Sequence, residues 1–146
     1  MEKTTLGRSQ ARGMMRLGAV LVLMGLFTGL MVPHLANPRL GLSSHMEGVM
    51  SGLLLMVTGA IWPRLRLGAA AMRAACFSLI YGAFTNWANT LLAAYWGAGA
   101  SMMPMASLGH RGSPVQETVI AIIAVTMALA LLFGVCMTLW GLRGEG

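Results

Sequence analysis

The stretch "MEGVMSGLLLMVTGAIW", residues 46–62, is an apolar run with a single charged residue near its start. A helix needs about 20 mostly apolar residues to cross the hydrocarbon core of a bilayer. Three other stretches have the same character, and together they predict spans at about residues 15–33, 45–63, 74–97 and 116–142. The sequence therefore predicts an all-α, integral membrane four-helix bundle that forms one domain over residues 1–146.

The composition also indicates a membrane protein. Of the 146 residues, 57% are hydrophobic and only 10% are charged, which is too apolar for an ordinary soluble domain. The net charge of +6 comes from basic residues that flank apolar runs, so we expect a lipid bilayer and no nucleic acid as a partner. The two cysteines lie inside apolar segments without metal-ligand spacing, which favours a packing role.

The basic residues predict the orientation of the spans. Loops rich in Lys and Arg face the cytoplasm. Arg39 and Arg111 lie on one side of the predicted bundle, and the other eight basic residues lie on the opposite side: Lys3, Arg8, Arg12, Arg16, Arg64, Arg66, Arg73 and Arg143. We therefore expect both termini to be cytoplasmic.

Local signals mark the starts of two helices on the outer side. Ser44 and Glu47 match a capping box for span two, and capping is a sufficient explanation of Glu47. Ser113 and Gln116, with a proline between them, give the same signal for span four. Residues 97–112, rich in Gly, Ala and Met, are predicted to form a long outer loop that is suited to act as a lid.

Glycines are spaced for close approach of helices in two spans. Gly25 and Gly29 form a GxxxG pattern in span one, and Gly48 and Gly52 form another in span two. Helix packing explains the first pattern. In span two, His45 stands above the glycines on the same helix face, which leaves room for a flat ligand as an alternative to packing.

Span three is unusually polar along one face. In a bilayer such groups need a partner or a cavity, and hydrogen bonding between helices is the simpler explanation. The expected orientation brings the outer end of this face close to His45 and to Glu117, at the start of span four. The polar face comprises Ser78, Tyr81, Gly82, Thr85, Asn86 and Asn89.

Three segments carry a resemblance to a known family. The stretches "NPRLGLSSHMEGVMSGLLLMVTGAIW" and "YGAFTNWANTLLAAYWG", with "GH" at 109–110 and "QE" at 116–117, resemble hydroxylaminobenzene mutase and, more distantly, styrene oxide isomerase. The resemblance spans nearly the whole chain. It implies an isomerase of the bacterial inner membrane that converts hydroxylaminobenzene, a small aromatic hydroxylamine, to 2-aminophenol in nitroarene degradation.

The more distant relative implies the cofactor and the assembly. It is a homotrimeric haem b enzyme whose axial histidine precedes a glycine by seven positions, a spacing that His45 and Gly52 reproduce. Its span-three asparagine matches Asn86 when the chains are aligned on that histidine. Two positions depart from the pattern, because Ser51 stands where the relatives place Asn and Thr90 stands where the isomerase has Tyr, so these two substrate contacts are not carried over.

The resemblance and the polar pattern together give a predicted site. His45 is the expected iron ligand, with ferric haem as Lewis acid. The expected cofactor-binding residues are His45, Gly48, Gly52, Arg39 and Arg111, the two arginines facing either haem propionates or lipid. The expected catalytic residues are Asn86, Asn89, Tyr81 and Glu117, of which Glu117 is either a proton acceptor or simply a favourable helix-start residue.

A small membrane transporter or efflux subunit is the alternative function. Four short apolar helices with few charges are also typical of such proteins. A transporter normally needs an ionisable group near the middle of the bilayer for coupling, and the sequence pattern indicates none.

Overall fold

The computed structural model describes residues 2–143, with side chains from residue 7 onward; residue 1 and residues 144–146 of the predicted domain lie outside the described residues. The described chain is helical and contains no strand, which confirms the all-α prediction. Short 3-10 turns follow the first two long helices, at Val32–His34 and Trp62–Arg64. The α-helices are α1 (Glu2–Met31), α2 (Pro38–Ile61), α3 (Ala69–Trp96), α4 (Pro104–Ser107) and α5 (Pro114–Gly141).

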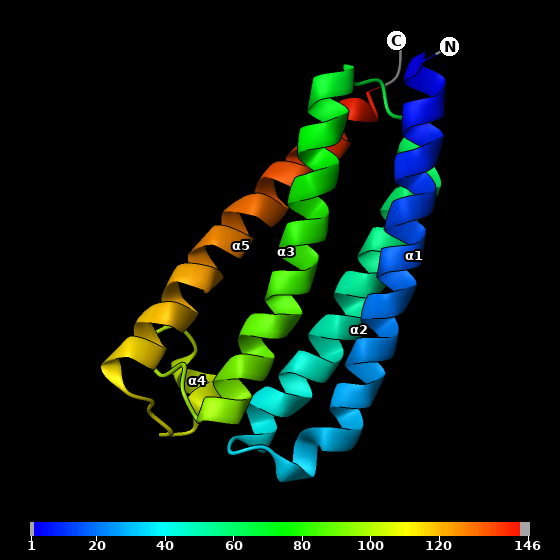
Figure 1. The fold of residues 1–146 in the computed structure, drawn as a ribbon. Helices are drawn as coiled ribbons and strands as arrows, with labels where there is room; N and C mark the ends of the chain where they lie inside the picture. Colours follow the sequence, from blue (N-terminus) through cyan, green and yellow to red (C-terminus); the bar gives the residue numbers. More distant parts are fainter. Residues whose placement is uncertain (1, 144–146) are drawn as a thin grey trace.

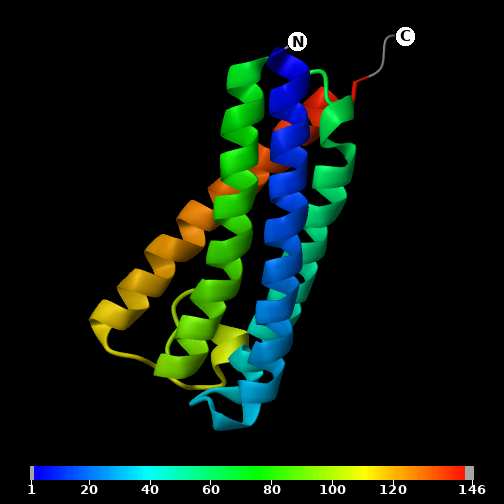
Figure 2. The ribbon, with the colours of Figure 1, turned by 45° about the vertical axis from the view of Figure 1, so that its right-hand side comes forward.

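The helices α1, α2 and α3 lie side by side, and α5 leans away from α3 toward its own N-terminal end (Figures 1 and 2). The beginning of α1 and the end of α5 lie at the same end of the molecule (Figure 1). The short helix α4 lies at the opposite end, within the segment that connects α3 to α5 (Figure 1). This segment is the outer loop that the sequence predicts.

Three segments are long and apolar enough to cross a membrane: Gly7–His34, Pro38–Arg64 and Pro114–Gly141. They contain the predicted spans one, two and most of span four. The helix α3 is not among them, because its asparagines and other polar residues lower its hydropathy. The predicted span at 74–97 therefore stays a prediction, although α3 runs its full length beside the other helices.

Buried apolar side chains form two clusters. One gathers Met14, Leu21, Leu55, Trp62 and Leu79 between α1, α2 and α3. The other cluster packs the turn between α1 and α2, together with the start of α2, against the end of α3 and the start of α5. Its members are Leu35, Leu40, Ala93, Ala94, Ala98 and Ile120. The exposed faces of the long helices are also apolar, as a lipid environment requires.

The start of α2 differs from the prediction. Its N-cap is Asn37, whose Oδ1 accepts from the Leu40 amide at 3.2 Å, with Pro38 in the first turn. Ser44 lies inside the helix and its hydroxyl donates to the Trp87 carbonyl at 3.0 Å. The predicted capping box of Ser44 and Glu47 is therefore wrong.

The start of α5 matches the prediction. The Ser113 hydroxyl accepts from the Gln116 amide at 3.3 Å, and the Gln116 side chain accepts from the Ser113 amide at 2.8 Å. Both halves of the capping box are present. This helix therefore begins where the outer loop ends.

Gly48 and Gly52 of α2 pack directly on α1. A Cβ at Gly52 would lie 2.6 Å from the Gly18 carbonyl oxygen, and a Cβ at Gly48 would lie 2.7 Å from the Gly25 Cα. Both obstacles are backbone atoms, which cannot move without separating the helices. The strip that was predicted to leave room for a flat ligand is thus filled by α1, and the structure favours the packing interpretation of these glycines.

Replacing Gly52 by alanine is expected to lower the free energy of unfolding by about 1–3 kcal/mol, as overpacking does. Alanine is intrinsically the better helix former, so a loss of stability identifies the contact with Gly18 as its cause. Thermal unfolding of the protein in detergent measures the effect. The matched control is Gly13→Ala in α1, where nothing lies within 4 Å of the added Cβ; equal behaviour of the two variants contradicts the prediction.

Candidate active site

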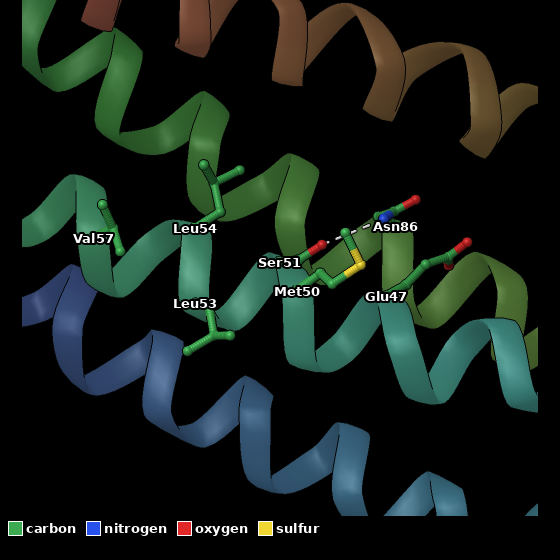
Figure 3. Close-up of a pocket in the computed structure, with 7 residues that line it drawn as sticks. All are labelled: Glu47, Met50, Ser51, Leu53, Leu54, Val57 and Asn86. Atoms are coloured by element: carbon green, nitrogen blue, oxygen red, sulfur yellow. Dashed lines mark hydrogen bonds between the residues drawn. The ribbon is translucent and has the colours of Figure 1, made fainter.

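A pocket of about 510 Å³ lies on the flank of α2 and α3. Its polar members gather toward one end, where the Asn86 amide nitrogen donates to the Ser51 hydroxyl at 3.3 Å (Figure 3). Apolar side chains make up the rest of the wall (Figure 3). The lining residues are Glu47, Met50, Ser51, Leu53, Leu54, Val57 and Asn86.

Helix periodicity explains why the polar members meet. Glu47 and Ser51 are four residues apart on α2, and Asn86 and Thr90 are four residues apart on α3, so each pair lies on one helix face. The Thr90 hydroxyl lies beside the Glu47 carboxyl group and donates to the Asn86 backbone carbonyl oxygen at 3.2 Å. The two departures from the relatives' pattern, Ser51 and Thr90, therefore both contribute to this polar cluster.

Glu47 is the residue that the sequence interpretation missed. It lies about two and a half turns inside α2, and its Oε2 atom is buried without a hydrogen-bond partner among the described residues. An acidic residue inside an apolar span is a candidate functional residue by itself, because burial of a polar group there is costly. That signal was available in the sequence, but the local resemblance to a capping box concealed it.

Asn89 is almost completely buried, with 1% of its surface exposed. Neither its Oδ1 nor its Nδ2 has a hydrogen-bond partner among the described residues. Buried carboxamides are normally bonded, so this one needs a water molecule or another group from outside the described residues. It does not line the pocket that contains Asn86, and its predicted catalytic role stays a prediction.

The His45 side chain packs on α1. Its Nδ1 lies 2.8 Å from the Gly25 carbonyl oxygen, and the ring lies over Gly29, where an added Cβ would be 2.8 Å from Nδ1. A carbonyl oxygen can only accept, so Nδ1 carries the proton. In the neutral imidazole the other ring nitrogen, Nε2, then carries the lone pair, which is the tautomer that can bind a metal through Nε2.

The predicted cofactor-binding residues agree with haem binding in one respect and disagree with it in another. The donor chemistry of His45 suits an axial ligand, with the Gly25 carbonyl fixing the tautomer. Gly48 and Gly52 provide no space for the macrocycle, because α1 occupies their face. A haem held by His45 therefore has to lie outside the α1–α2 interface.

Tyr81 lies away from the pocket. Its hydroxyl is 3.0 Å from the Thr126 hydroxyl of α5, and its ring stacks on Phe77. Helix geometry explains the separation, because Asn86 follows Tyr81 by five positions, which places the two side chains on different faces of α3. The structure thus does not bring Tyr81 together with Asn86.

Glu117 anchors the outer loop. Its Oε1 accepts from the amides of Gly99, Ala100 and Gly112 at 3.0, 3.3 and 3.0 Å, and its Oε2 accepts from the amide and hydroxyl of Ser101 at 3.1 and 3.0 Å. A carboxylate held by five donors is poorly placed to accept a proton from a substrate. The geometry therefore favours a structural role for Glu117 at the helix start, the alternative that the sequence left open.

Replacing Glu117 by alanine is expected to release residues 99–112 from α5. Hydrogen exchange of the Gly99, Ser101 and Gly112 amides should accelerate by about tenfold or more, the factor that loss of even one bond to a charged group produces. Mass spectrometry of the exchanged loop peptides measures it. Thr118→Ala is the control, because Thr118 bonds only within its own helix; unchanged exchange in the Glu117 variant contradicts the anchor.

The predicted propionate partners are both exposed. Arg39 lies in the first turn of α2, and Arg111 lines a small pocket of about 300 Å³ beside Glu117. The two arginines belong to different outer segments, and the described residues do not show one site that both side chains line. Their predicted role stays a prediction.

Comparison with known proteins places the chain among membrane isomerases. The family model described as styrene oxide isomerase matches residues 10–143. Hydroxylaminobenzene mutase HabB of Ectopseudomonas oleovorans is 48% identical over 133 residues, which cover 91% of this chain and 81% of HabB. Hydroxylaminobenzene mutase HabA of the same organism is 43% identical over 114 residues, which cover 78% of this chain and 84% of HabA. No solved structure matches the chain.

Proposed function

Because the chain belongs to the styrene oxide isomerase family, we propose that it is a membrane-embedded mutase that converts hydroxylaminobenzene to 2-aminophenol. The product is an isomer of the substrate. The N–O bond breaks, the oxygen bonds to the ortho carbon, that carbon loses a proton, and the nitrogen gains one.

The observation that carries this proposal is the shape of the α2–α3 pocket. An aromatic hydroxylamine has an apolar ring and one polar substituent. The pocket offers an apolar wall of Met50, Leu53, Leu54 and Val57 and a polar end with Asn86 and Glu47 (Figure 3). Such a division orients the substrate, with the ring on the wall and the hydroxylamine at the polar end.

Asn86 is the residue that holds the reacting group. Its Nδ2 has two N–H groups, of which one is directed to Ser51, and its Oδ1 is an acceptor. The second N–H and the Oδ1 can therefore bind the hydroxyl and the nitrogen of the substrate. Fixed geometry of this kind lowers the barrier because the migrating oxygen has to be captured at the adjacent carbon.

His45 is the proposed ligand of haem b, through Nε2. The bound ferric haem would supply a Lewis acid that polarises the N–O bond. The Gly25 carbonyl keeps the proton on Nδ1 and thereby keeps Nε2 free for the iron. Arg39 and Arg111 remain the proposed cationic partners of the propionates.

The proposed setting is the bacterial inner membrane, with multiple spans, both termini in the cytoplasm, and a homotrimer as the assembly. The basic residues at the shared end of the α1 start and the α5 end support the cytoplasmic placement. The exposed apolar faces support both lipid contact and subunit contact. Cross-linking of the protein in its native membrane counts the subunits.

The function is tested with the protein purified in detergent. We expect a Soret band in the visible spectrum and conversion of hydroxylaminobenzene to 2-aminophenol, identified by chromatography. A folded protein that is colourless and inactive would contradict the proposal. It would instead favour a transporter, for which Glu47 now provides the ionisable residue inside the membrane.

A further inference from the structure

We propose that Glu47 selects substrates that carry a hydrogen-bond donor, by accepting from the N–H or O–H of an aromatic hydroxylamine. The inference rests on the proposed function for the identity of the substrate. It rests on the structure for the acceptor itself, because Glu47 lies at the polar end of the α2–α3 pocket and its Oε2 atom has no hydrogen-bond partner among the described residues (Figure 3).

The first step is the state of Oε2. The atom is buried and has no hydrogen-bond partner among the described residues. A buried acceptor without a donor costs free energy, and the protein recovers that cost when a donor arrives. The Glu47 carboxyl group therefore prefers an occupant that carries an N–H or O–H group.

The second step is that the neighbouring side chains leave this acceptor available. The apolar wall of the pocket, with Met50, Leu53, Leu54 and Val57, has no N–H or O–H group to offer. Of the polar neighbours, Asn86 directs its amide to the Ser51 hydroxyl, and the Thr90 hydroxyl donates to the Asn86 backbone carbonyl oxygen at 3.2 Å. An ionised carboxylate offers only acceptor oxygens, so a neutral occupant can hydrogen-bond to it only by donating.

The third step is the chemistry of the possible substrates. An aromatic hydroxylamine has both N–H and O–H donors, whereas an epoxide on an aromatic side chain has only an ether oxygen. A site that contains an acceptor without a partner discriminates strongly against a molecule that cannot donate to it. Glu47 would thus separate mutase substrates from epoxides within one family of similar proteins.

The test compares two small ligands of similar size, of which only one carries a hydrogen-bond donor. Aniline and toluene have nearly the same size, but only aniline has N–H groups. Isothermal titration of the purified full chain in detergent is expected to show that aniline binds about tenfold more tightly, which corresponds to one hydrogen bond. Glu47→Leu should remove the preference, and Glu47→Gln, which keeps an acceptor oxygen, should retain most of it.

Two further measurements make the result specific. Met50→Leu changes the apolar wall of the same pocket and should leave the ratio of the two affinities unchanged. Undiminished preference in a folded Glu47→Leu protein overturns the proposal, as does an equal loss in Glu47→Gln and Glu47→Leu.

The titration needs no turnover, so its outcome is separate from that of the proposed function. A chain that fails to convert hydroxylaminobenzene and still shows the Glu47-dependent preference would overturn the function alone. A chain that converts it without the preference would overturn the role of Glu47 alone.

Discussion

The His45→Ala protein is expected to lose its Soret band and to lose mutase activity by at least about 100-fold, because removal of an outer-shell partner of a metal ligand already costs about 10- to 100-fold. Alanine has no nitrogen with which to hold iron. The imidazole is the group to remove because its Nδ1 is fixed by the Gly25 carbonyl and its Nε2 is left for a metal. Visible spectra and turnover of hydroxylaminobenzene measure the two losses.

His34→Ala is the matched control for this variant. His34 lies in the exposed turn after α1, on the same outer side of the chain as His45, and should not affect either reading. Addition of free imidazole to His45→Ala is expected to restore part of the Soret band, because it can occupy the vacated space. A His45→Ala protein that retains the full haem spectrum would exclude His45 as the ligand.

The Asn86→Ala protein is expected to keep its haem and to lose about 100-fold or more in kcat, the loss that removal of one oriented donor in a reacting site produces. KM should change less, because the apolar wall that holds the ring is unaltered. Steady-state kinetics together with the visible spectrum separate the two effects.

Two variants control for disturbance of α3 and of the pocket. The hydroxyl of Thr85 bonds within its own helix, so Thr85→Val should have little effect on kcat. Ser51→Ala removes the partner of the Asn86 amide but leaves the amide in place, and its effect should be smaller than that of Asn86→Ala. An unchanged kcat in Asn86→Ala removes the residue from the mechanism.

The apolar runs determine most of what was predicted about the fold. Because burial in a bilayer demands long apolar helices, their approximate positions follow from composition, and the capping box of α5 follows from local residues alone. The start of α2 was placed too late, since its first turns precede the apolar run. The pair Asn37–Pro38 was the usable signal there.

The candidate site was harder to predict because its decisive contacts join distant segments. The Glu117 carboxylate accepts hydrogen bonds from amides near both ends of the outer loop, at Gly99 and Gly112. No local sequence pattern specifies which loop residues fold onto the start of a helix. The sequence around Glu47 also matches a capping box, so the local pattern did not distinguish a helix start from a position inside the helix. Only the structure shows that Glu47 lies beside residues of α3 in the pocket. Periodicity placed Gly48 and Gly52 on one face of α2 but could not show that α1 covers that face.

The contact of His45 with Gly25 and Gly29 has a thermodynamic consequence. The same ring that is proposed to hold the cofactor also fixes the register of α1 against α2. Assembly of these two helices and loading of the cofactor are then linked equilibria, so each raises the apparent equilibrium constant of the other. Newly synthesised protein without cofactor would be the less stable form, and the supply of cofactor would set how much folded enzyme the cell retains.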